Sequence, residues 1–276
     1  MFDRNNGKLI GLFALMDPVF NLKVRDDWVG WTVDQRVRRL ASVMDAYVLG
    51  AVPPYSQLLG GKLIASLIGS AEVSQVFDDR YGDSTGIISG KRKQSKLALV
   101  TVTSALGRSS LYNRLKLPGY VDMTKIGVTS GWGHFHIPDE LFLKMRQLLL
   151  IDGHLYADGH NYGTGPNWKI RVIRQALRSI GMDPNLLRHG ISREVYGLPL
   201  ASNWQSYLRG ETDDAVVDRP SAVEIAETAK RRWLVRLSRG RPDYRRWTFE
   251  DTLALFQPLL NNTCELHVQD NKNLLI

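Results

Sequence analysis

A polar corner directly follows the most strand-like run of the sequence, residues 97–102, and consists of Gly107, Arg108 and Ser109. Ligands often bind at the carboxyl ends of parallel strands, because loops converge there and the next helix offers free backbone N–H groups to an anion. A tight strand-to-helix turn explains the same residues, with Gly107 supplying the backbone conformation and Ser109 capping a helix. Both interpretations stay open from sequence.

The densest group of basic side chains lies in residues 230–246, interleaved with Trp233, Tyr244 and Trp247. The basic residues are Lys230, Arg231, Arg232, Arg236, Arg239, Arg241, Arg245 and Arg246. Arginines interleaved with aromatic residues can bind phosphates and stack on bases, and the net charge of +8 also favours a polyanionic partner. A helix with solvated arginines and buried aromatic residues is the alternative. We expect a nucleic-acid surface here, although another phosphate-rich partner would suit it equally.

Metal chemistry has little support. Cys264 is the sole cysteine, so an intramolecular disulfide and a cysteine-based zinc site are both impossible. His134 and His136 could share one face of a strand, with His154 or His160 as a third ligand, but no acidic second shell is evident. We predict no metal. Two other dense polar groups, RDDW at 25–28 and RHGISREVY at 188–196, complete the candidates.

The elements that must position these residues are predicted from apolar patterning. Strands of a central mixed sheet are expected at residues 9–16, 47–52, 97–102 and within 124–137, the last as a hairpin, with a further short strand at 86–89. The strands at 47 and 97 are expected to be parallel neighbours that splay at their carboxyl ends. Helices are expected at residues 32–47, 57–70, 109–115, 139–153, 166–182 and 221–240.

Three parts follow from this pattern: an α/β domain at 1–137, a helical and loop extension packed on it at 138–212, and a basic helical region at 213–276. With 276 residues and 43% hydrophobic content, the chain can bury a sizeable core. It begins without a signal segment, and its apolar runs are far shorter than a membrane span. We therefore expect a soluble cytoplasmic protein.

The order of elements resembles the GNAT acyltransferase fold. In that family a glycine-containing pattern after one strand holds the pyrophosphate of coenzyme A, and VPPYSQLLGGKL supplies Gln57 and Gly60 at matching places. Lys62 replaces the family's final small residue, although a lysine could itself pair with phosphate. The resemblance thus implies an acyl-CoA-like cofactor bound by Gln57, Gly60, Lys62 and the corner at 107–109.

The same resemblance implies catalytic residues. A tyrosine on a short helix protonates the departing thiolate in the family, and SSLYNRL puts Tyr112 at that position. Asp45, at the start of the strand that leads to Gln57, is the carboxylate that topology favours as a base. Packing is the alternative for both, with Tyr112 as a half-buried aromatic residue and Asp45 as the partner of an arginine.

A second resemblance covers nearly the whole chain. The succession of RDDWVGW, LLGGKLIASL, VFDDRYG, TSALGRSSLYNRL, IGVTSGWGHFHI, GPNWKIR and RHGISREVYGLPLASN is similar to the DruA family of the Druantia anti-phage systems. It implies a role in bacterial defence beside a large helicase-like partner. Because the chain begins abruptly at its first strand, we expect that an N-terminal segment found in relatives is missing.

Two function classes therefore stay open. The first is an enzyme of GNAT-like fold that transfers an acyl or related group, with nucleic acid as the acceptor. The second is a non-catalytic subunit that binds phage nucleic acid and presents it to the helicase partner.

Overall fold

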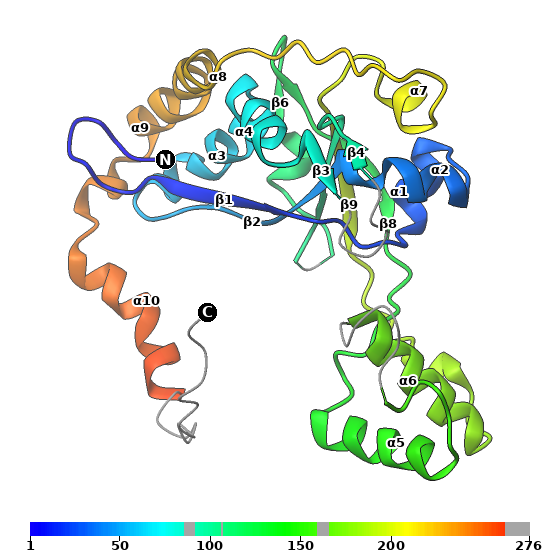
Figure 1. The fold of residues 1–276 in the computed structure, drawn as a ribbon. Coiled ribbons are helices and arrows are strands. Elements are labelled where there is room, and N and C mark those ends of the chain that lie inside the picture. The colour runs from blue at the N-terminus through cyan, green and yellow to red at the C-terminus, as the bar shows by residue number, and fades with distance from the viewer. Residues whose placement is uncertain (86–91, 106, 159–165, 263–276) are drawn as a thin grey trace.

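A five-stranded mixed sheet forms the centre of the protein in a computed structural model, which describes residues 1–85, 92–105, 107–158 and 166–262. Its order is β1-β2-β5-β9-β8 (Figure 1). The strands are β1 (Gly11–Met16), β2 (Val43–Ala51), β5 (Leu99–Thr103), β9 (Glu194–Pro199) and β8 (Thr124–Val128). Helices flank this sheet, so the predicted fold class is confirmed.

The neighbouring strands β2 and β5 run parallel, while the other three pairs of the sheet are antiparallel. Their pairing begins at Val43 with Leu99 and ends at Asp45 with Thr101. Beyond that point β2 pairs with β1 alone and β5 with β9 alone. The two strands therefore part toward their carboxyl ends, as the sequence predicted.

The two faces of the sheet bury different clusters, because successive side chains of a strand point to opposite faces. Met44, Val100 and Tyr196 face the larger cluster beneath α3 (Gly60–Leu67) and α8 (Ala222–Ala229). Val43 and Leu99 face a second cluster to which α1 and α7 contribute side chains, and α2 packs beside α7. Those helices are α1 (Lys23–Val29), α2 (Val33–Arg39) and α7 (Trp204–Leu208).

The predicted helix after the second strand exists, but it begins later than Ser56 suggested. A short 3₁₀ turn, η2 (Tyr55–Leu58), comes first, and Leu59 then adopts a left-handed conformation with φ of 59° before α3 begins. All of α3 is buried. A Cβ on Gly60 would lie 2.6 Å from the carbonyl oxygen of Tyr55, so the packing of the chain itself requires glycine here.

The chain between β8 and β9 forms a helical lobe that lies to one side of the sheet (Figure 1). We use this name for residues 132–158 and 166–190. It contains α5 (Asp139–Ile151), α6 (Pro166–Ser179) and the 3₁₀ turn η4 (Pro184–Leu187). The lobe has its own hydrophobic cluster, which includes Phe142, Leu149 and Ile173 and is separate from the two clusters of the sheet.

Several sequence predictions need correction. Residues 124–137 form no hairpin, because β8 pairs with β9 and the chain beyond Val128 leaves for the helical lobe. The predicted helix at 109–115 is only the 3₁₀ turn η3 (Tyr112–Arg114). Strand β9 was not expected, and it brings part of the predicted extension at 138–212 into the sheet. The strand predicted at 86–89 lies outside the described residues. The boundaries at 137 and 212 stay a prediction.

The smaller elements flank this framework. They are α4 (Ala71–Tyr81), the paired strands β3 (Asp83–Thr85) and β4 (Arg92–Gln94), the paired strands β6 (Lys116–Leu117) and β7 (Val121–Asp122), and the 3₁₀ turn η1 (Leu40–Ser42). Across the described part of the chain, every helix is too short or too polar to span a membrane.

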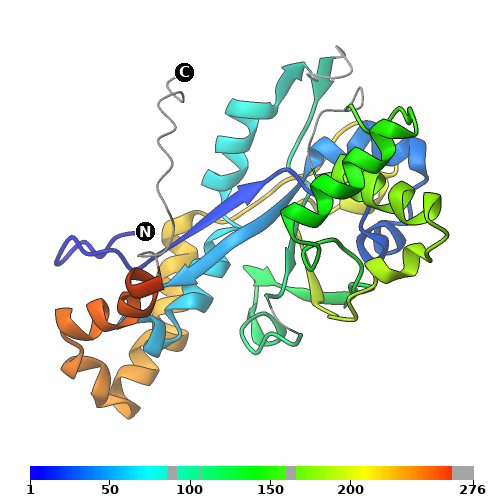
Figure 2. The same cartoon turned by 90° about the horizontal axis from the view of Figure 1, so that it is seen from below.

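The basic region is helical, as predicted. It runs from α8 through a π-helical turn, η5 (Lys230–Val235), into α9 (Arg236–Gly240). The turn η6 (Pro242–Arg246) and the helix α10 (Phe249–Asn262) follow. Figures 1 and 2 agree that α8 and α9 lie near one end of β1 and β2, away from the helical lobe at the opposite end.

Candidate functional site

The polar corner after β5 already holds an anion, the carboxylate of Glu194 on β9. The backbone N–H of Ser109 donates to Oε2 of Glu194 over 3.2 Å. Gly107 lies at φ of 43° and forms a bridge with Arg193, next to Glu194. The Ser109 hydroxyl accepts from the N–H of Tyr112, which is the capping contact expected of it. Arg108 is exposed. The Ser109 amide predicted for a ligand therefore binds a side chain of the protein instead.

Glu194 gathers donors from three parts of the chain. Its carboxylate accepts from Nζ of Lys125 at 2.5 Å, from Nδ2 of Asn113 at 3.0 Å and from the hydroxyl of Tyr196. The Lys125 and Tyr196 contacts lead the causes that lower the pKa of Glu194 to about 2. Burial and this carboxylate raise the pKa of Tyr196 to about 12. The group fixes the corner to β9 and keeps the carboxylate ionised.

The residues predicted to hold a cofactor are engaged in packing. Nζ of Lys62 donates to the carbonyl of Arg114 at 3.1 Å and lies 5.3 Å from the centre of the Trp233 ring. The backbone carbonyl of Gln57 accepts from Arg241. Gly60 is buried against η2.

This arrangement does not fit the pyrophosphate of an acyl-CoA. Such a site needs backbone N–H groups at the start of a helix that a ligand can approach. Gly60 and Gly61, which begin α3, are both buried, and a Cβ on Gly61 would lie 2.7 Å from a methyl carbon of Leu111. Burial, followed by Arg114 and Arg232, lowers the pKa of Lys62, so its ammonium is already poorly solvated. We derive no reaction step through this cofactor.

Tyr112 and Asp45 lie on opposite faces of the sheet. Tyr112 packs against the larger cluster, with its ring 5.3 Å from that of Tyr196. Asp45 alternates with Met44 on β2 and accepts from the hydroxyl of Thr101 at 2.9 Å on the face that α1 covers. The structure therefore does not bring Tyr112 and Asp45 together on one face of the sheet, and their catalytic roles stay a prediction.

Burial raises the pKa of both groups. For Asp45 the hydrogen bond from Thr101 and the charge of Arg25 oppose that shift. For Tyr112 burial is the cause. Among the described residues, the Tyr112 hydroxyl has no hydrogen-bond partner, so its O–H group is available to donate a hydrogen bond beside the corner at 107–109.

The RDDW group is a structural clamp. Arg25 is fully buried, and its Nε and Nη2 donate to Oδ1 of Asp26 at 2.9 and 2.7 Å. Arg36 on α2 donates to Oδ2 of the same carboxylate at 2.7 Å, and Trp31 donates to Oδ1. Two helices and the turn between them thus share one carboxylate.

The basic surface is built by a helix with a narrow apolar stripe. Ser221 caps the start of α8 through a capping box with Glu224. Ile225, Ala229 and Trp233 then recur at four-residue spacing and are buried against the larger cluster. The positions between them carry the cations.

All eight predicted basic side chains are exposed. Within the described residues, two of them have acidic partners: Lys230 lies 3.5 Å from Glu227, and Arg246 lies 4.0 Å from Asp243. Arg241 and Arg245 make polar contacts with other groups, to the Gln57 carbonyl and the Tyr244 hydroxyl. Four arginines in the described part of the chain have no polar partner at all: Arg231, Arg232, Arg236 and Arg239. We call the eight residues the basic surface.

One further arginine, Arg114 on η3, lies near the basic surface and was not among the predicted site residues. The positive charges of Arg114 and Arg232 both lower the pKa of Lys62, so these three cations lie near one another. Arg114 is exposed and belongs to the turn that carries Tyr112. Its only sequence signal is a lone arginine after the tyrosine, which is too common to indicate a site.

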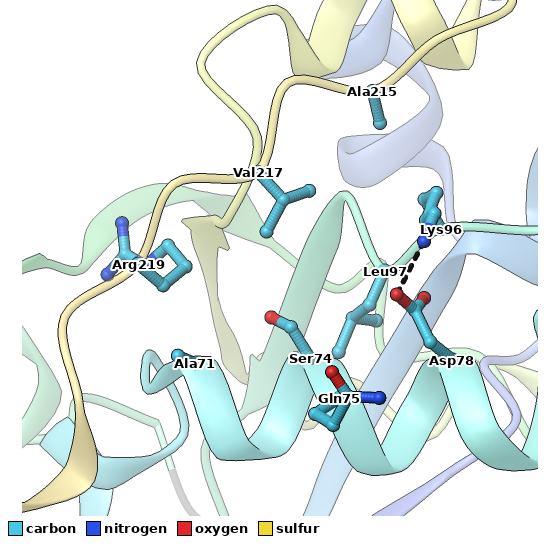
Figure 3. A pocket seen from close by; sticks show the side chains of 9 residues that line it. All are labelled: Ala71, Ser74, Gln75, Asp78, Lys96, Leu97, Ala215, Val217 and Arg219. Atoms are coloured by element: carbon cyan, nitrogen blue, oxygen red, sulfur yellow. Dashed lines mark hydrogen bonds and ion pairs between the residues drawn. The ribbon is translucent and has the colours of Figure 1, made fainter.

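Groups of three or more metal-binding side chains do not occur among the described residues, and His160 lies outside them. A cavity of about 270 Å³ lies between α4 and the segment before α8 (Figure 3). The Oγ atom of Ser74 is buried there without a partner, and an ion pair of Lys96 with Asp78 lines one side. None of the predicted site residues lines this cavity.

Comparisons with known proteins agree on one family. The family model of Druantia protein DruA matches residues 1–210. A curated relative, Druantia protein DruA of Escherichia coli (strain UMEA 4076-1), is 49% identical over 271 residues, which are 98% of this chain and 66% of the relative. The chain thus spans just under two thirds of that relative's length. No solved structure matches the chain, so no structural neighbour supports the GNAT resemblance.

Proposed function

This chain belongs to the DruA family of Druantia proteins, and from that premise we propose that it is an anti-phage defence protein that binds nucleic acid through the basic surface. The observation that carries the proposal is the exposure of eight cations within residues 230–246, over η5, α9 and η6, with two acidic partners among the described residues. Clustered like charges repel one another, and a polyanion relieves that repulsion by releasing its own counterions.

The shape of the segment supports binding to the phosphate backbone rather than to base edges. The apolar stripe fixes the helix to α3, and the cations project from the remaining positions. Flexible arginine side chains on an outer surface suit phosphates, which carry no sequence information. We therefore expect affinity for many sequences, and we propose that the bound strand passes to the helicase-like partner that the family resemblance implies.

The test compares two quadruple variants of equal net charge. The first replaces Arg231, Arg232, Arg236 and Arg239 with serine, because these arginines have no polar partner to lose. The control replaces four exposed arginines from elsewhere in the chain: Arg4, Arg38, Arg80 and Arg178. Fluorescence anisotropy with labelled oligonucleotides of several sequences should show weaker binding for the first variant by a similar factor on every sequence. Equal affinity of both variants would contradict the proposal.

Group transfer is the second candidate, and the parting of β2 from β5 favours it. Because α3 is buried, we expect a cofactor to bind only if the basic helix moves away from Lys62. A thermal-shift series with acetyl-CoA tests this, since a ligand of the folded state raises Tm. We expect no shift with acetyl-CoA and a rise with nucleic acid.

A further inference from the structure

We propose that Phe135, His136 and His189 form a base-stacking site for single-stranded nucleic acid at the base of the helical lobe. This inference rests on the proposed function and adds the class of strand to it. We call the three residues the ring cluster. None of them belongs to the basic surface, and the family comparisons assign them no role.

The ring cluster presents an open aromatic face. The Phe135 ring lies 4.6 Å from the His189 ring in an edge-to-face arrangement, and the His136 ring is 6.2 Å from that of His189. Phe135 is nevertheless 61% exposed. The ring is therefore accessible, and any base can stack on an accessible aromatic face.

Backbone contacts hold the rings in place. The segments that carry them run antiparallel, through a bridge between Trp132 and Arg188. Nε2 of His136 lies 3.1 Å from the carbonyl of Leu186 and must carry a proton, because a carbonyl only accepts. Nδ1 of His189 accepts from the N–H of Ile191 at 3.1 Å, which leaves the proton on Nε2.

These contacts leave one hydrogen-bonding edge free on each histidine. Among the described residues, Nδ1 of His136 and Nε2 of His189 have no partner. One is an acceptor and the other a donor, a combination that the edges of unpaired bases complement. The rings are therefore oriented before a ligand arrives, which reduces the entropic cost of binding.

The charge around the rings suits phosphates. Residues 129–137 and 186–193 contain arginines and histidines, and of the acids that flank them, Asp139 is paired with Lys169 and Glu194 with Lys125. Arg188 is exposed, and Nε of Arg193 is buried without a partner. Arg174 of α6 lies 5.5 Å from the centre of the Trp132 ring. A strand whose bases reach the rings would therefore meet cations beside its backbone.

A single strand fits these features better than a duplex does. Bases in a duplex are stacked on one another and cannot offer a face to Phe135. The ring cluster belongs to the helical lobe, and α9, which carries part of the basic surface, lies near the end of β1 and β2 away from that lobe (Figures 1 and 2). A flexible strand could contact both places, with phosphates on the basic surface and bases on the rings.

The test uses Phe135→Leu, which removes the ring but keeps an apolar side chain, and Phe135→Trp, which restores a ring. Ile151→Ala is the control, because Ile151 is 85% exposed on α5 of the same lobe. Each variant is titrated with oligothymidylate, oligouridylate, an abasic strand of the same length and a duplex. The two base-bearing strands separate DNA from RNA as the source of the bases.

We expect Phe135→Leu to weaken binding of a base-bearing strand about tenfold, which is the loss of about 1.4 kcal/mol for one stacked base. Its affinity for the abasic strand and the duplex should not change, and Phe135→Trp should bind as the wild type does. An unchanged affinity of Phe135→Leu for both base-bearing strands would overturn the inference. If that result is found while the variant with Arg231, Arg232, Arg236 and Arg239 replaced by serine binds more weakly, the proposed function stands and only the stacking site is wrong. If the wild type binds none of the four ligands, both fail.

Discussion

Replacing Asp26 with asparagine is expected to destabilise the protein strongly, although both side chains have the same size. The Asp26 carboxylate faces two cations, Arg25 and Arg36, whose side chains are 0% and 12% exposed. It also accepts from Trp31 at 3.1 Å. Asparagine keeps one acceptor oxygen but removes the charge, so the buried Arg25 loses its ionic partner.

The magnitude follows from the burial of Arg25. Removing one partner of a buried ion pair costs about 3–5 kcal/mol, because the other charge stays buried without compensation. Burial lowers the pKa of Arg25, which marks how poorly its guanidinium is solvated. Since Asp45 still acts on Arg25 from the sheet and one acceptor remains, we expect about 3 kcal/mol. In a chain of this size, that lowers Tm by roughly 6–12 °C.

The neighbouring Asp27 provides the matched control. It pairs with Lys23 on the same helix, but their side chains are 62% and 85% exposed. Asp27→Asn should therefore change the free energy of unfolding by less than about 0.5 kcal/mol. Urea denaturation of both variants measures the difference. Equal stability of the two would refute the structural role given to the RDDW group.

Three further predictions concern Glu194 and Asp45 of the sheet and Tyr112 of η3. The pKa of Glu194 falls from 4.5 to about 2 on folding. Its contribution to stability is therefore complete above pH 4.5 and is lost as the pH falls toward 2. In a series of Tm against pH, Glu194→Gln should show a smaller fall in Tm below pH 4.5 than the wild type does. Burial instead raises the pKa of Asp45, so its carboxyl favours folding most when protonated, and Asp45→Asn should lose the gain in Tm on acidification without being less stable at neutral pH. Tyr112→Phe should keep its Tm, because the hydroxyl has no partner among the described residues, and should lose protection in a phage plaque assay if Tyr112 is the acid of a transfer reaction. Full protection by that variant would remove the role.

The elements with a clear local pattern could be predicted from sequence, and β9 could not. Strands β1 and β5 lie in apolar runs, and α5, α6 and α8 have helical periodicity. The first half of β2 was wrongly expected within a helix at 32–47, because the apolar residues Val37, Leu40 and Met44 follow a helical spacing while β2 contains the polar Asp45. The sequence of β9, EVYGLP, contains glycine, proline and a glutamate, which are more typical of a loop. Gly197 is needed there because a Cβ would lie 2.3 Å from the Trp28 ring, a contact between residues far apart in the chain.

The candidate site divides in the same way. The spacing of Ile225, Ala229 and Trp233 indicates which side of the basic helix is buried, so the exposed cations could be predicted from local sequence alone. The contact of Ser109 with Glu194 joins residues 85 positions apart, and no local pattern marks it. Asp45 follows Met44 directly on β2, so the two side chains point to opposite faces of the sheet. The order of the strands alone does not show which face Asp45 occupies.

The salt dependence of nucleic-acid binding tests the central claim most directly. Each phosphate contact contributes about 0.7–0.9 to the slope of log affinity against log salt concentration, so four lost contacts should reduce the slope by about three. We predict that reduction for the variant in which Arg231, Arg232, Arg236 and Arg239 are serine. The control variant, with Arg4, Arg38, Arg80 and Arg178 replaced, should keep the slope of the wild type. The same slope in all three proteins would contradict the assignment of the basic surface to phosphate binding.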